Sequence, residues 1–166
     1  GRLLGEGYEP EMFYAVEPSI QLYIAEKSEA LRELYVSSYS YAATANYIHQ
    51  MATDKLVELF GAMHPQYTRQ DFYELELASS GMVRSFMARK CDRNFTMEQK
   101  LRRFLSCSMT IYGVTEEKQQ QVIDRVLEMD LKSVADQLVA DAIHQADEQY
   151  QEAERKGKAI EAARNG

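Results

Sequence analysis

The sequence has few residues that interrupt helices. It contains three prolines and eight glycines in 166 residues, and the stretches 19–60, 82–112 and 114–156 contain neither. β-Strands would need turn signals about every 8–12 residues, and such signals are missing. The sequence therefore predicts an all-α fold, which we expect to be an antiparallel bundle of about seven or eight helices.

Other absences narrow the class of protein. Two cysteines, Cys91 and Cys107, are too few for a disulfide scaffold and fit a reducing compartment. No apolar run approaches the roughly 20 residues needed to cross a bilayer, and no leader segment opens the chain. The net charge of −7 argues against a free-standing nucleic-acid binder. We expect a cytoplasmic protein without membrane contact and, because the chain begins with Gly1 and not Met, a fragment of a longer one.

Motifs that carry catalysis are missing as well. The chain has no phosphate-binding glycine loop, no G-x-S-x-G and no H-E-x-x-H. The two cysteines have no C-x-x-C spacing and no neighbouring histidine, so a zinc site is not expected. Asp141 and His144 have the spacing of one carboxylate-x-x-His motif, but a di-metal bundle needs this motif twice together with two further carboxylates. We therefore expect no enzyme activity, no metal and no cofactor.

Breakers and capping residues divide the chain into helices. Pro18 suits the first turn of a helix. Ser28 favours a break at which a second helix begins, although one continuous helix with a snorkelling Lys27 is the alternative. Thr96 and Gln99 form a capping box. Further helices are expected over 42–61, 68–91, 96–113 and 115–129, with a last one capped by Asp130. Residues 1–150 should form one domain, and the polar, alanine-rich segment 151–166 is expected to fray.

The helix expected over 68–91 carries a carboxylate on its apolar face. Glu76 lies within the arc formed by Phe72, Leu75, Ser79, Met82, Val83, Phe86 and Met87. Desolvating a carboxylate alone is costly, so Glu76 must be paired, hydrogen-bonded or neutralised. Two interpretations stay open. Glu76 has a structural partner such as Arg84 or a nearby tyrosine, or it is a polar contact in a ligand cavity.

Tyrosine and methionine are abundant, with eleven Tyr and eight Met and no Trp. Tyr35, Tyr39, Tyr41 and Tyr47 lie close together in the sequence. Such side chains suit an adaptable pocket for a flat or cationic ligand, and they also occur as ordinary core and interface residues. The candidate ligand-binding residues are Tyr47, Met51, Phe72, Glu76, Ser79, Met82 and Phe86.

Several stretches resemble the effector domains of TetR-type bacterial repressors. They are Leu31-Arg-Glu-Leu-Tyr-Val-Ser-Ser-Tyr-Ser40, the helix with Tyr47-Ile48, Gly81-Met-Val-Arg84, the helix 97–112, the break Gly113-Val114-Thr115 and the segment 126–130. The resemblance covers roughly residues 10–150. It implies an all-helical regulatory domain that follows a DNA-binding helix-turn-helix, holds a small-molecule pocket and dimerises through a four-helix bundle. Nothing in residues 1–20 can form the DNA-binding head, so we expect that head to be absent from this chain.

The resemblance thus implies a ligand-sensing, homodimerising domain. Its expected partners are a second copy, an unknown small-molecule effector, and DNA only through the missing N-terminal domain. The helix 96–112 offers an apolar arc wide enough to face two neighbours, and its candidate interface residues are Leu101, Phe104, Leu105, Ser108, Ile111 and Tyr112. The alternative is a helical protein–protein interaction module without a ligand pocket, which would bind a partner helix through its Tyr/Met surface.

Overall fold

The structure, a computed structural model, describes residues 9–164. Within this part of the chain the regular structure is helical and no β-strand is formed, which confirms the all-α prediction. The helices are α1 (Pro10–Lys27), α2 (Glu29–Ser38), α3 (Ala42–Phe60), the short 3₁₀-helix η1 (Gly61–Met63), α4 (Arg69–Ala88), α5 (Met97–Ile111), α6 (Glu116–Glu128) and α7 (Leu131–Arg164).

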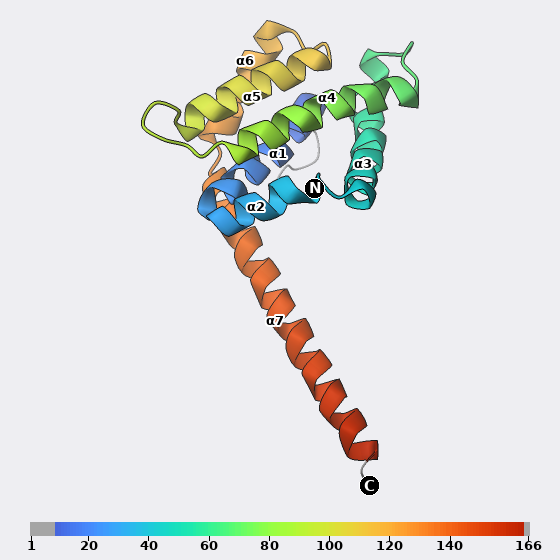
Figure 1. The fold of residues 1–166 in the computed structure, drawn as a ribbon. Helices are drawn as coiled ribbons and strands as arrows, with labels where there is room; N and C mark the ends of the chain where they lie inside the picture. Colours follow the sequence, from blue (N-terminus) through green and yellow to red (C-terminus); the bar gives the residue numbers. More distant parts are fainter. Residues whose placement is uncertain (1–8, 165–166) are drawn as a thin grey trace.

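Helix α1 is the centre of the bundle and packs against each of α2 to α7 (Figure 1). It begins at Pro10, and Pro18 lies inside it, so the predicted start at Pro18 is wrong. The reason is that the buried residues Met12, Ala15 and Val16 continue the helical spacing upstream of Pro18, while Pro10 fits the first turn equally well. Because a proline has no N–H, Pro18 cannot donate the usual intrahelical hydrogen bond to residue 14.

Capping residues set the starts of α2, α4, α5 and α7 as predicted. The Leu31 N–H donates to the Ser28 hydroxyl at 3.1 Å, which confirms the break between α1 and α2. Thr68 and Thr96 each form a complete capping box, with Asp71 and Gln99 respectively. Helix α7 begins after Asp130, whose carboxylate accepts the Ser133 N–H at 3.1 Å.

Gly113 ends the segment that contains α5. Its φ of 70° lies in the left-handed region, which glycine adopts without a steric penalty. A Cβ at this position would lie only 3.0 Å from Cε1 of His64. The same histidine is held by its Nε2, which is 2.7 Å from the Tyr112 carbonyl oxygen. The turn after α5 thus depends on the absence of a side chain at residue 113.

Helix α5 is packed within the bundle, so its apolar arc contacts helices of the same chain. Of the six expected interface residues, Leu101, Phe104, Leu105, Ser108 and Tyr112 are buried, and Ile111 is partly buried. The two neighbours that the arc faces are α4 and α6 of the same chain, with α1 beneath them. Within this chain the five buried side chains belong to the core, and their role in a dimer stays a prediction.

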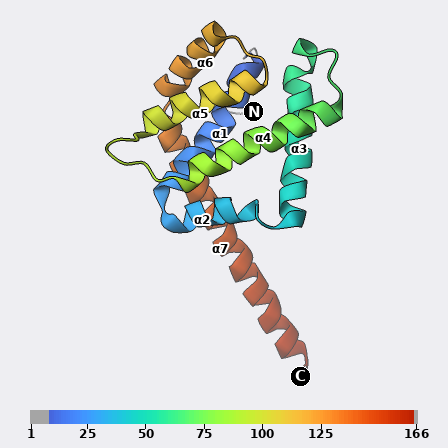
Figure 2. The same cartoon turned by 45° about the horizontal axis from the view of Figure 1, so that its top comes forward.

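Helix α7 leaves the bundle and extends away from it (Figures 1 and 2). Leu131 and Ala135 are buried at its base, and Lys27 at the end of α1 forms an ion pair with Asp136. From Ala140 to Lys156 every side chain is exposed. The helix continues to Arg164, through a segment that was expected to fray. None of the helices in the described residues combines the length and the apolar character needed to span a membrane.

Candidate functional site

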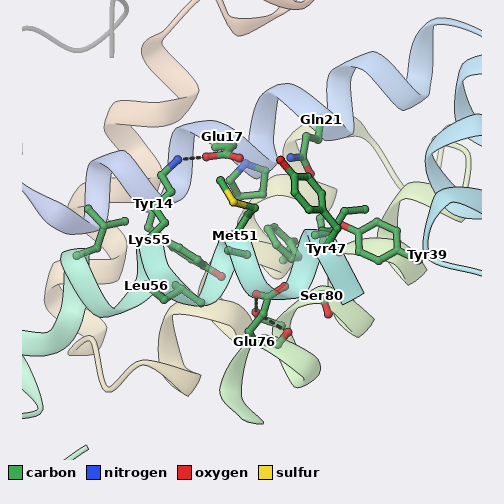
Figure 3. A pocket seen from close by; sticks show the side chains of 17 residues that line it. Tyr14, Glu17, Gln21, Tyr39, Tyr47, Met51, Lys55, Leu56, Glu76 and Ser80 are labelled. Atoms are coloured by element: carbon green, nitrogen blue, oxygen red, sulfur yellow. Dashed lines mark hydrogen bonds and ion pairs between the residues drawn. The ribbon is translucent and has the colours of Figure 1, made fainter. Parts of the chain in front are cut away.

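A cavity of about 430 Å³ lies between α1, α3 and α4 (Figure 3). Pockets for small organic ligands usually enclose about 300–1,000 Å³, so this one has room for a small molecule. Tyr39, directly after α2, and Phe104 of α5 complete its wall. The cavity is lined by Tyr14, Glu17, Pro18, Gln21, Tyr39, Tyr47, Ile48, Met51, Ala52, Lys55, Leu56, Leu59, Glu76, Ser79, Ser80, Val83 and Phe104.

The charged residues of the lining occupy opposite sides of the cavity. Glu17 of α1 and Lys55 of α3 form an ion pair at one side, where both side chains are about half exposed (Figure 3). Glu76 of α4 lies at the other side, and its side chain is only 8% exposed. Since Lys55 is paired with Glu17, the buried charge that faces the cavity is the Glu76 carboxylate.

Among the described residues Glu76 is held by His49 and Ser79, and it forms no ion pair with a lysine or arginine. Its Oε1 lies 3.3 Å from Nδ1 of His49, and its Oε2 accepts the Ser79 hydroxyl at 3.2 Å. Burial raises the pKa of Glu76 above the ordinary value of 4.5, and this effect outweighs the opposing effects of His49 and Ser79. The two interpretations of Glu76 are therefore not exclusive, because it has partners within the fold, though not Arg84, and also lines the cavity.

Hydroxyl groups extend from Glu76 into the core. The Ser79 hydroxyl lies 2.7 Å from the Tyr112 hydroxyl, and the Tyr112 ring stacks on Phe60 with centroids 5.0 Å apart. Tyr14 packs edge-on against both of these rings. Burial raises the pKa of Tyr14 to about 12, so its hydroxyl stays protonated and neutral at physiological pH.

The rim of the cavity is aromatic. Tyr47 and Met51 of α3 are 67% and 56% exposed, and Tyr39 lies beside them (Figure 3). Burial raises the pKa of Tyr39 to about 12, with a smaller contribution from the charge of Glu76. The rim therefore presents neutral aromatic rings, whose faces attract cations.

The structure brings four of the seven predicted ligand residues together: Tyr47, Met51, Glu76 and Ser79 line the cavity. Phe72, Met82 and Phe86 do not. Phe72 is buried against His64 and Tyr67, and Phe86 packs against Phe95 and Phe104. Met82 packs on the hydrophobic core. The apolar face of α4 packs against several helices. Only the part of this face that is directed towards α3 and α1 borders the cavity.

The sequence did not predict the contribution of α1 or most of that of α3, since Tyr47 and Met51 are the only predicted residues among the α3 side chains that line the cavity. Tyr14 and Glu17 precede Pro18, where the helix was expected to begin. Lys55 could have been found, because residues 47, 51 and 55 are spaced by four and share one helix face. Nothing in the sequence connects that face with α1, since the two helices meet only in the tertiary structure.

The described residues contain no group of three or more His, Cys, Asp and Glu side chains that could hold a metal ion. Asp141 accepts a hydrogen bond from Gln137, and His144 lies 3.5 Å from Glu148 on the exposed face of α7.

Comparison of the sequence with family models and with curated proteins, and of the fold with solved structures, finds no match.

Proposed function

We propose that this chain is the ligand-sensing domain of a TetR-like transcription regulator and that it binds a small apolar cation in the cavity between α1, α3 and α4. The observation that carries the cation is the buried Glu76 carboxylate, which faces an aromatic cavity and pairs with no Lys or Arg of the described residues. Its basic partner within the fold is His49, at 3.3 Å, and a cationic ligand would add a permanent positive charge beside the carboxylate.

The energetics favour a cation over other ligands of the same size. Burial disfavours the ionised form of Glu76. Without a ligand, the desolvation of this carboxylate is therefore only partly compensated by its hydrogen bonds. A bound cation offsets that cost through a charge-assisted interaction, and the rings of Tyr14, Tyr39 and Tyr47 add cation–π attraction. An anion would be repelled by the Glu76 carboxylate, since Glu17 and Lys55 neutralise each other.

The regulator class is supported by the sequence resemblance, by the all-helical fold and by the position of the cavity. The cavity lies between helices that a ligand could shift relative to each other. A ligand that binds one arrangement of α1, α3 and α4 better than another changes the population of the two. In the full regulator this change would alter the spacing of two DNA-binding heads.

Titration calorimetry with benzyltrimethylammonium tests the cation. A parallel thermal-shift measurement compares this cation with neopentylbenzene, which has the same shape and no charge. Glu76→Gln should weaken binding of the cation about tenfold to a hundredfold, because it removes a charge-assisted contact worth about 1.5–3 kcal/mol. Neopentylbenzene should stabilise the wild type and Glu76→Gln equally.

Glu74→Gln is the matched control, since it removes the same charge from the exposed face of the same helix. It should leave the affinity for benzyltrimethylammonium unchanged. If Glu76→Gln and Glu74→Gln bind the cation alike, or if the wild type does not distinguish it from neopentylbenzene, the proposed ligand class is wrong.

The regulator class has its own test. A reading frame that encodes a basic helix-turn-helix immediately upstream of Gly1 is the expected result, and an upstream sequence without such a motif would contradict the TetR-like assignment.

A second candidate function is a helical interaction module. The observation that favours it is the exposed apolar surface of α7, on which Leu138, Ile143 and Tyr150 are 47%, 59% and 72% exposed. A pull-down with α7 substituted distinguishes this function, because binding to a protein partner would then depend on α7 and not on Glu76.

A further inference from the structure

Helix α7 carries an apolar seam beyond the point at which it leaves the bundle. The seam consists of Val139, Ile143, Ala146, Tyr150 and Ala153, which alternate in steps of four and three residues. This is the a/d repeat of a coiled coil, and the same spacing continues in the sequence at Gly157 and Ile160. The repeat keeps all these positions on one face of the helix.

Val139 packs on the core at the base of α7, and none of the described residues covers the seam beyond it. Helix α7 packs against α1 near its base, and every residue from Ala140 to Lys156 is exposed. A single helix in water gains little stability from its own hydrogen bonds, and most helices depend on packing of an apolar face. A long helix with an exposed a/d seam is therefore expected to pack this seam against a partner helix.

We propose that α7 pairs in parallel with α7 of a second copy of this chain. The seam alternates larger with smaller side chains, Ile143 and Tyr150 with Ala146 and Ala153, which allows two identical helices to approach closely. This inference does not depend on the ligand, because no seam residue lines the cavity. A chain that fails to bind cations would still dimerise.

The charges beside the seam select the parallel orientation. Asp147 and Glu154 occupy the e positions that follow Ala146 and Ala153. In an antiparallel pair the e positions of the two helices face each other, so these carboxylates would meet carboxylates. In a parallel pair they face the g positions of the other helix, which are Ala142 and Gln149. The parallel pair contains no like-charge contact among these residues.

Parallel pairing also fixes where the two bundles lie. Figure 2 shows that the bundle lies at the N-terminal end of α7. In a parallel pair both bundles would therefore lie next to each other at that end. An antiparallel pair would hold the bundles at opposite ends. The proposed dimer thus places two cavities on one side of the assembly.

Sedimentation equilibrium on the full chain tests the pairing. The wild type should be a dimer at micromolar concentration, and Ala146→Glu should raise the dimer dissociation constant about tenfold or more, because it buries a charge in the seam. Gln145→Glu introduces the same side chain one residue away, off the seam, and should dimerise like the wild type. Ala, Gln and Glu all favour helices, and circular dichroism should show equal helix content.

Cross-linking tests the orientation. In a background of Cys91→Ser and Cys107→Ser, the variants Ala146→Cys and Ala153→Cys should each form an intermolecular disulfide. A parallel, in-register pair brings every d position next to its own copy, whereas an antiparallel pair can do so at one position at most. Cross-linking at only one of the two positions, or at neither, overturns the parallel pairing. A wild type that is a monomer, or an Ala146→Glu variant that dimerises like the wild type, overturns the pairing itself.

Discussion

Helices α5 and α7 both carry an apolar stripe, but only one of the stripes is covered by the chain itself. Leu101, Phe104 and Leu105 of α5 are buried beneath α1, α4 and α6. Ile143 and Tyr150 of α7 are mostly exposed. The sequence predicted α5 as a candidate dimer surface, and it predicted fraying only for residues 151–166, beyond Ile143 and Tyr150. An apolar stripe predicts that a helix has a neighbour, and it does not say whether that neighbour belongs to the same chain.

The largest expected difference between the two helices is in the free energy of unfolding. Leu105→Ala should lower it by about 2–5 kcal/mol, because it leaves a cavity in a packed core. Ile143→Ala should change it by less than about 0.5 kcal/mol in the monomer, since no contact within the chain is lost. Urea denaturation of the dilute protein measures both. Equal losses for the two variants would show that the apolar stripe of α7 is covered within the chain as well as that of α5.

A smaller effect on stability is expected from Glu76, which is a carboxylate buried in the bundle. The pKa of Glu76 is raised by burial, so ionised Glu76 disfavours the folded state above that pKa, and the penalty vanishes below the ordinary value of 4.5. Glu76→Gln should therefore raise the Tm relative to the wild type at pH 8, and the gain should shrink as the pH falls toward 5.

Scanning calorimetry across this pH range gives the two Tm values, and Glu74→Gln supplies the control. Because Glu74 is exposed, its substitution should change the Tm little and equally at both ends of the range. A gain for Glu76→Gln that stays constant, or grows at low pH, would show that the buried carboxylate does not limit stability.

Local signals in the sequence predict most of this fold. Ser28, Thr68, Thr96, Thr115 and Asp130 mark helix starts, because a capping side chain acts within its own turn. The start of α1 was wrong because a proline that suits a first turn is also tolerated within a helix that is held by its neighbours. Helix α7 extends to Arg164, and the fraying expected from the polar, alanine-rich composition of 151–166 stays a prediction.

The candidate site is only partly readable in the sequence. Glu76 and Ser79 were found because polar side chains on an apolar helix face need partners. Tyr47 and Met51 were found because clustered tyrosine and methionine side chains suit an adaptable pocket. Phe72, Met82 and Phe86 share the same face of α4, yet they pack against other neighbours. Which part of a broad face borders a cavity is decided by how helices meet. Spacing along one helix does not contain that information.

The central claim is that an ionised Glu76 binds a cation in the α1–α3–α4 cavity, and the pKa of its carboxyl group tests this most directly. Carbon NMR on protein labelled in the glutamate carboxyl groups, with Glu76→Gln to assign the signal, gives this pKa with and without saturating benzyltrimethylammonium. We expect a pKa above 4.5 in the free protein and a clear decrease when the cation is bound. A pKa that the cation leaves unchanged would contradict it.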